Sequence, residues 1–256
     1  MASPLSLPTV PTATIGGLPI AALDRVDTAR LMLKLAAAHP EDAPPLYMTS
    51  ANGQVLSEAA RRPELRRLFE AADLISADGQ PMVLWSKVAA RVAIPERCAT
   101  TDLYHDVSRQ AAPGTRYYLL GSTAQEVERA VETTRRLYPH ITIAGYRDGY
   151  FTPAEEPAVA AAVAATRPDI LWIAMGVPRE QEFICRRLRE LAGVRLVKTS
   201  GGLFNFLSGT RSRAPGLMQA AGLEWLYRMM LEPRRLFWRY LVTNLHSGFL
   251  LLTRTR

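Results

Sequence analysis

Two spacings of hydrophobic residues alternate along the chain. Short, nearly continuous apolar runs are typical of buried strands, whereas apolar residues repeated every three or four positions are typical of helices with one buried face. The strand-like runs lie at residues 46–49, 74–75, 116–121, 141–145, 169–175 and 195–199, and the helix-like stretches at 28–38, 54–60, 63–71, 81–88, 124–137, 154–166 and 179–191. An extended segment at 15–23 precedes them. This alternation predicts an α/β fold with a Rossmann-like, mostly parallel sheet and helices on both faces.

Residues at the ends of the helical stretches support this assignment. Asp27 is a fair N-cap for the first helix, and Ser122 or Thr123 can cap the helix at 124–137. Pro81 and Pro178 stand where two further helices begin, a position at which the fixed backbone angle of proline is tolerated.

The pattern divides the chain into three parts. Residues 1–13 are rich in Pro, Ser and Thr and lack periodicity, so we expect a disordered leader. Residues 14–210 form the α/β domain. Residues 211–256 form a basic, amphipathic helical appendage, in which Pro233 is expected to separate a helix at 224–231 from one that begins at Arg234.

Positive charge is concentrated in the appendage. Of the net charge of +7, residues 211–256 supply +6, from eight arginines and two glutamates. This end of the chain is thus suited to a nucleic acid, a membrane surface or a phosphate group. Its bulky Leu, Phe and Trp residues favour a bilayer surface and argue against nucleic acid. No apolar run is long enough to span a membrane, and no secretory signal is recognisable.

Candidate catalytic residues gather where strands end. Asp78-Gly79 follows the strand at 74–75, and Thr49 and Asn52 lie at the end of the preceding strand, so all are expected on one edge of the sheet. A carboxylate there, beside a glycine that lets a substrate approach the backbone, is suited to act as a general base. The alternative is that Asp78 only caps the next helix or starts a turn.

Three further strand ends are glycine-rich turns, at Gly121-Ser-Thr, Gly176-Val-Pro178 and Ser200-Gly201-Gly202. Their backbone N–H groups can bind an anionic group such as a diphosphate, although simple chain reversal is the alternative. Gln181 and Glu182 follow at the start of a helix, where they either favour the helix terminus or reach a nucleotide. The absence of a Gly-x-Gly-x-x-Gly fingerprint argues against a dinucleotide-dependent oxidoreductase.

No metal or cofactor is predicted. Neither an Asp-x-Asp pair at a strand end nor histidines at ligand spacing occur in the chain. Cys98 and Cys185 form no metal motif and imply no disulfide framework, and no Ser-His-Asp or Cys-His arrangement is identifiable.

Short motifs also follow one another in a specific order over almost the whole chain. They are Thr49 with Asn52, Ala77-Asp-Gly79, Pro95-Glu-Arg97, Thr101-Asp-Leu103, Leu119-Leu-Gly121, Gly149-Tyr-Phe151, Pro168-Asp169, Gly176-x-Pro178 with Gln181-Glu182, Gly201-Gly-x-Phe204, Arg213-Ala-Pro215 and Glu224-Trp-Leu-Tyr-Arg228. Each motif is weak alone. Together, and in this order, they resemble the WecG/TagA/CpsF glycosyltransferase family (family 26 of the glycosyltransferases).

This resemblance implies an inverting, metal-independent transfer of a sugar, of the N-acetylmannosamine type or glucose, from a UDP-sugar donor to a saccharide on a polyprenyl diphosphate. Asp78 matches the family's base, and an inverting transfer needs one base to deprotonate the acceptor hydroxyl. The resemblance also implies catalytic roles for Thr49, Asn52 and Arg97, and a nucleotide-sugar site formed by Gly121, Gly176, Pro178, Gln181, Glu182, Gly201, Gly202 and Asn205. The family commonly has aspartate at the position of Asn205, so the amide can alter the choice of base or donor.

The appendage is expected to dock on the anionic, cytoplasmic face of the cell membrane as a peripheral arm and to complete the active site. Its candidates for binding the lipid-linked diphosphate are Arg213, Arg228, Arg235 and Arg239. The apolar surface of an interfacial helix is expected from Leu236, Phe237, Trp238, Leu241, Leu245, Phe249, Leu250, Leu251 and Leu252. A helical hairpin with a solvated basic face is the alternative. A homo-oligomer is compatible with the sequence.

Overall fold

The computed structural model describes residues 9–220 and 223–256, with the backbone alone at 219–220, 228, 235–237 and 239–240. The central sheet contains β3 (Leu46–Ala51), β4 (Leu74–Ala77), β5 (Arg116–Gly121), β6 (Thr142–Arg147), β7 (Ile170–Ala174) and β8 (Leu196–Thr199). Its strand order is β4-β3-β8-β7-β5-β6, and every pairing is parallel. The predicted parallel α/β sheet is confirmed.

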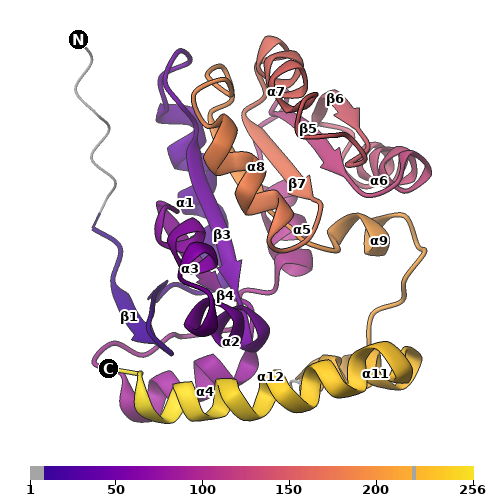
Figure 1. The fold of residues 1–256 in the computed structure, drawn as a ribbon. Coiled ribbons are helices and arrows are strands. Elements are labelled where there is room, and N and C mark those ends of the chain that lie inside the picture. The colour runs from indigo at the N-terminus through magenta and orange to yellow at the C-terminus, as the bar shows by residue number, and fades with distance from the viewer. Residues whose placement is uncertain (1–8, 221–222) are drawn as a thin grey trace.

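Helices cover both faces of the sheet because successive strand residues point to opposite sides. One face, which includes Met48 and Trp172, packs against α1 (Arg25–Ala38), α5 (Thr100–Gln110), α6 (Ala124–Leu137) and α9 (Leu203–Leu207). The other face, which includes Tyr47 and Leu171, packs against α7 (Glu156–Ala165) and α8 (Arg179–Arg187) (Figure 1). The sheet is thus buried between two layers of helices.

A third apolar cluster lies beside β4. It joins α2 (Gly53–Arg61), α3 (Pro63–Glu70) and α4 (Gln80–Ala89) to an antiparallel hairpin of β1 (Thr12–Ile15) and β2 (Leu18–Ala21). The prediction of one extended segment at 15–23 is therefore wrong, because the chain reverses at Gly16 and Gly17, whose φ angles are 56° and 92°. The last two residues of the predicted leader, Thr12 and Ala13, belong to β1, and residues 1–8 lie outside the described part of the chain.

Two local predictions on this side of the sheet need correction. Asp24, not Asp27, is the N-cap of α1, since an Asp24 carboxylate oxygen accepts the backbone N–H of Asp27 at 2.7 Å. Helix α5 was not predicted, because its threonine and tyrosine residues have modest helix propensity and hide the three- and four-residue spacing of its buried positions, Leu103, Tyr104 and Val107.

The appendage consists of α10 (Gly216–Ala220), α11 (Glu224–Leu231) and α12 (Pro233–Thr253). The predicted break at Pro233 is confirmed. Helix α12 crosses the molecule beside α2, where His246 Nδ1 lies 2.9 Å from Ser57 Oγ (Figure 1). Arg256 then exchanges backbone hydrogen bonds with Thr14 of β1, at 3.0 and 3.2 Å. The end of the appendage is thus built into the fold.

Burial divides the predicted apolar surface of α12. Leu250 and Leu251 are buried in the cluster beside β4, so their assignment to a docking surface is wrong. Trp238, Leu241, Leu245, Phe249 and Leu252 are exposed, and the side chains of Leu236 and Phe237 lie outside the described part of the structure. In the part of the chain that is described, no helix has the length and apolarity that crossing a membrane requires.

Candidate active site

The carboxyl ends of β3 and β8 mark a reversal in the order of the sheet. These strands are neighbours, but the chain leaves β3 through α2 on one side and leaves β8 through α9 on the other. In open α/β sheets such a switch point is where ligands bind. Asn52 follows β3 directly, Ser200 follows β8, and Asp78 follows the adjoining β4, whose Ala77 pairs with Ala51.

Asp78 faces the N-terminus of α5. The backbone N–H and the hydroxyl of Thr100 each lie 3.4 Å from Asp78 Oδ2, where the helix dipole favours negative charge. The residue before α4 is Gly79, and no side chain caps that helix, so the alternative in which Asp78 caps it is wrong. Burial raises the pKa of Asp78, while the guanidinium of Arg97 acts in the opposite direction. The result is a carboxylate suited to accept a proton.

Lys198 stands beside this carboxylate and was missed at the level of sequence. Its side chain is fully buried on β8, and its ammonium donates to Ser50 Oγ at 2.7 Å and to the carbonyl of Thr199 at 2.9 Å. Burial lowers the pKa of Lys198 to about 8. The available signal was a single lysine inside an apolar strand, a position where burying a charge is costly unless it has partners.

Charged residues of the appendage reach the same edge of the sheet. Glu224, the first residue of α11, pairs with Arg97 and accepts hydrogen bonds from the Arg213 guanidinium at 3.2 and 3.3 Å. Arg213 also pairs with Asp102 of α5, which Arg25 of α1 approaches at 3.5 Å. Burial raises the pKa of Asp102, but the Arg213 guanidinium outweighs burial and holds it below its usual value. Arg97 and Arg213 therefore lie together near Asp78, and Glu224 is a further site residue.

The structure separates Thr49, inside β3, from Asn52, which follows that strand. Asn52 is exposed at the edge, and its side-chain oxygen caps α2 by accepting the Val55 N–H at 3.1 Å. Thr49 is fully buried on the opposite side of the sheet from Lys198, with its hydroxyl 2.8 Å from that of Thr199. Thr49 therefore lies level with the end of β8 but faces away from Lys198, because successive strand residues point to opposite faces, and its catalytic role stays a prediction.

Two glycine-rich turns bind a carboxylate of the protein itself. One oxygen of buried Glu180 accepts the backbone N–H groups of Met175, Gly176 and Gly201, at 3.1 to 3.3 Å. The N–H groups of Gly176 and Gly201 therefore do not serve a diphosphate in this structure. Sequence reasoning missed Glu180, although a glutamate directly before Gln181 in the first turn of α8 was a possible signal.

The remaining candidates for the nucleotide site have the following contacts. Gln181 is buried beside Glu180 and donates to it at 3.3 Å, and Glu182 pairs with Arg186 at 3.7 Å. Pro178 follows a cis peptide bond before α8, and Gly202 precedes α9. Gly121 has a φ of 139° and lies against the Ala174 backbone, where a Cβ would be 2.3 Å from the carbonyl oxygen. Asn205 donates to Glu126 Oε1 at 2.6 Å.

A separate hollow at the amino ends of the strands has a structural explanation. It is lined by Glu41, Arg116, Arg167, Asp169 and Arg195 among others. Arg195 pairs with Glu41 at 3.0 Å and with Asp169 at 3.3 Å, and Arg116 donates to carbonyls of the α7–β7 turn. These ion pairs and hydrogen bonds join loops at the amino ends of the strands, the edge of the sheet opposite to Asp78.

Comparison with known proteins assigns the chain to a family. The sequence matches the "Glycosyl transferase WecG/TagA/CpsF family" over residues 13–256. The chain belongs to this family. A relative from Bacillus spizizenii, named N-acetylglucosaminyldiphosphoundecaprenol N-acetyl-beta-D-mannosaminyltransferase, is 31% identical over 228 residues, which cover 88% of this chain and 86% of the relative. The protein is thus a glycosyltransferase, as the motifs predicted.

The remaining site predictions concern three arginines of the appendage, the two cysteines and a metal ion. The side chains of Arg228, Arg235 and Arg239 lie outside its described part, so their role as diphosphate ligands stays a prediction. Cys98 and Cys185 are free thiols. Among the described residues, no three His, Cys, Asp or Glu side chains are grouped as the ligands of a metal ion would be.

Proposed function

We propose that the protein transfers a sugar, of the N-acetylmannosamine type or glucose, from a UDP-sugar to a saccharide linked to a polyprenyl diphosphate, in the synthesis of a cell-surface polysaccharide. The family and the printed activity of the Bacillus relative support this substrate class. The observation on which the proposal rests most is the Asp78 carboxylate at the switch point of the sheet, beside the guanidinium groups that the appendage and the loop before α5 supply.

In this reaction Asp78 takes the proton from the acceptor hydroxyl as that oxygen attacks the anomeric carbon. The bond between the sugar and the UDP oxygen breaks at the same carbon, on the opposite face, so the configuration inverts. One base is enough for such a displacement. A carboxylate whose pKa burial has raised accepts a proton more readily than an exposed aspartate does.

The leaving diphosphate needs positive charge, and arginines are candidates to supply it. Arg97 and Arg213 share Glu224 in the present structure, so each can turn toward an anionic ligand while the carboxylate keeps the other in place. Guanidinium groups bind phosphate oxygens bidentately. We therefore propose that the transfer needs no divalent cation.

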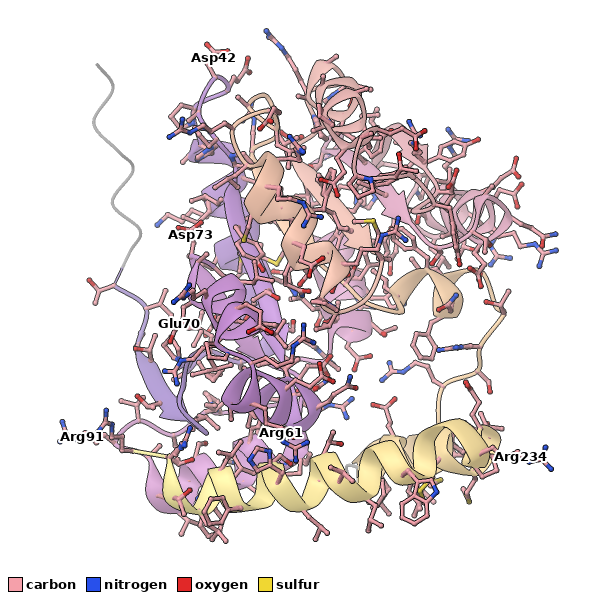
Figure 2. All side chains as sticks on the ribbon, in the orientation of Figure 1. Asp42, Arg61, Glu70, Asp73, Arg91 and Arg234 are labelled. Atoms are coloured by element: carbon pink, nitrogen blue, oxygen red, sulfur yellow. The ribbon has the colours of Figure 1, made fainter. Side chains whose placement is uncertain are left out.

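We further propose that the protein binds the cytoplasmic face of the cell membrane through α4 and α12. Met82 and Val83 of α4 and Leu250 of α12 belong to one buried cluster, while the outer faces of both helices expose apolar side chains. The exposed residues are Leu84, Val88, Trp238, Leu241, Leu245, Phe249 and Leu252. Basic residues border this face, and Figure 2 shows Arg61, Arg91 and Arg234 along the side of the molecule that α12 crosses. Apolar area with bordering cations is typical of interfacial binding.

A screen of sugar nucleotides tests the substrate class. Purified protein is mixed with each UDP-sugar and a short polyprenyl-diphosphate saccharide, and UDP release is measured with and without EDTA. We expect release only when donor and acceptor are both present, at the same rate in EDTA. Release from no UDP-sugar would contradict the donor class, and loss in EDTA with recovery in Mg²⁺ would contradict the metal-independent mechanism.

A further inference from the structure

A chain of hydrogen bonds joins Lys198 to Asp78. The ammonium donates to Ser50 Oγ at 2.7 Å, Ser50 Oγ lies 3.2 Å from Thr100 Oγ1, and the Thr100 hydroxyl lies 3.4 Å from Asp78 Oδ2. Ser76 Oγ approaches Ser50 Oγ from the side at 2.9 Å. Lys198 is fully buried, Ser76 and Thr100 are buried, and Ser50 and Asp78 are half-buried, so the chain leads from the interior to the carboxyl edge of the sheet.

An ionised Asp78 fixes the direction of the bond that it makes with Thr100. The carboxylate can only accept, so the Thr100 hydroxyl donates to it; Thr100 then has no proton left for Ser50. Ser50 accepts from Lys198, which has only donors, so its single proton goes either to Thr100 Oγ1 at 3.2 Å or to Ser76 Oγ at 2.9 Å, and Ser76 in turn donates to Ser50 or to the carbonyl of Thr49 at 3.3 Å. When Ser76 donates to Ser50 and Ser50 donates to Thr100, the chain runs one way, from the buried ammonium of Lys198 to the half-buried carboxylate of Asp78, and such chains strengthen along their length.

We propose that Lys198 is a positioning residue, which holds the Asp78 carboxylate in its proton-accepting orientation through the hydroxyl groups of Ser50 and Thr100. This inference rests on the proposed function, since Asp78 is the base in that reaction. Lys198 does not touch the substrate and forms no bond with it. Lys198 supplies the positive charge at one end of the hydrogen-bonded chain, and the Asp78 carboxylate at the other end accepts the proton.

The charges around the chain define an expected pH dependence. Lys198 faces Asp78, Cys98 and Glu180, and Asp78 also faces Arg97 and Glu224. The base works only when ionised, so turnover rises with pH through the pKa of Asp78. Lys198 lowers that pKa, because its positive charge favours the carboxylate. Removing the charge therefore moves the acid limb of the profile to higher pH.

The test compares variants at three points of the chain with a matched control. Lys198→Met removes the charge, Ser50→Ala interrupts the chain, and Thr100→Val removes the hydroxyl that touches Asp78. Thr134→Val is the control, because Thr134 is an equally buried helical threonine whose hydroxyl bonds to Tyr104 and Ala130, in the core around α6. The measurement is the pH profile of kcat with the KM of each substrate.

We expect Lys198→Met and Thr100→Val to lower kcat about 10- to 100-fold, as small displacements of a catalytic group do. The KM values should change little and the acid limb should shift, whereas Thr100→Ser should restore the profile and Thr134→Val should match the wild type. In an Asp78→Asn background Lys198→Met should cause no further loss. If Lys198→Met does not fold, the pH profiles of Ser50→Ala and Thr100→Val test the role of the hydrogen-bonded chain in its place.

The failure of this inference can be distinguished from that of the proposed function. All folded variants of the hydrogen-bonded chain could show the same pH profile as Thr134→Val while Asp78→Asn is inactive. That result would overturn the role of Lys198 but not the role of Asp78. Full activity of Asp78→Asn would instead overturn the base on which both depend.

Discussion

At the scale of single residues, the site depends on which polar atoms already have partners inside the protein. Asn205 shows this directly. Its amide donates to Glu126, which also caps α6 by binding the backbone and hydroxyl of Thr123. An amide can donate to a carboxylate, but an aspartate at the same position cannot when both groups are ionised. The asparagine therefore matches the glutamate in front of it.

This contact gives a prediction about stability. In Asn205→Asp, two carboxylates would face each other, which raises the pKa of at least one of them in the folded protein. The destabilisation, about 1 kcal/mol at this half-exposed site, is present at neutral pH and is lost as the pH falls and one carboxyl is protonated. Urea unfolding at pH 7 and pH 5 measures it, with Asn205→Ala as the control without repulsion. An equal stability of Asn205→Asp and wild type at pH 7 would contradict the contact.

Individual residues also show how far sequence can predict this site. The short apolar run before Asp78 predicts a strand end, so Asp78 and Asn52 could be located at the edge of the sheet. The burial of Thr49 could not be predicted, because a shift of one residue along the strand exchanges the positions that point to its two faces. Lys198 comes close to Asp78, and Glu180 to Gly201, only through the order of the parallel strands, which the sequence pattern does not specify. The contact of Glu180 with Gly176 is local.

At the scale of elements, the short helix α11 links the appendage to the α/β domain. Glu224 pairs with Arg97 and Arg213, and Arg211 pairs with Glu232 at 3.5 Å at the other end of this helix. The motifs around Arg213 and Glu224 thus have a visible structural role. The sequence predicted the helices on both sides of Pro233, since proline ends a helix by local sterics, but it did not predict which face α12 buries.

The outer face of α12 gives a prediction about membranes. The double variant Leu245→Gln/Phe249→Gln should bind anionic liposomes at least about tenfold more weakly, because each lost side chain would bury apolar surface worth roughly 1.5 kcal/mol or more. Both side chains are exposed, so thermal unfolding should be unchanged. Leu137→Gln, an exposed leucine at the end of α6, is the control. Flotation of the double variant equal to that of the wild type would show that this face does not bind lipid.

At the scale of the whole molecule, the C-terminal segment runs along one side of the fold and ends beside the first strand (Figure 1). It starts beside β8, contributes Arg213 and Glu224 near Asp78, crosses α2 and ends paired with β1 (Figure 1). The segment that carries part of the proposed membrane face therefore also supplies charged residues close to the proposed base. This arrangement suits an enzyme whose acceptor is attached to a lipid.

The central claim is that this glycosyltransferase uses Asp78 as its base. The most direct test is turnover of Asp78→Asn under saturating donor and acceptor, beside the wild type and Asp73→Asn. Asp73 stands at the other end of β4 and accepts the N–H of Tyr47, a bond that asparagine can keep (Figure 2). We expect Asp78→Asn to fold normally and to lose about 10²- to 10⁴-fold in kcat, while Asp73→Asn stays active. A folded Asp78→Asn protein with nearly wild-type turnover would contradict the account.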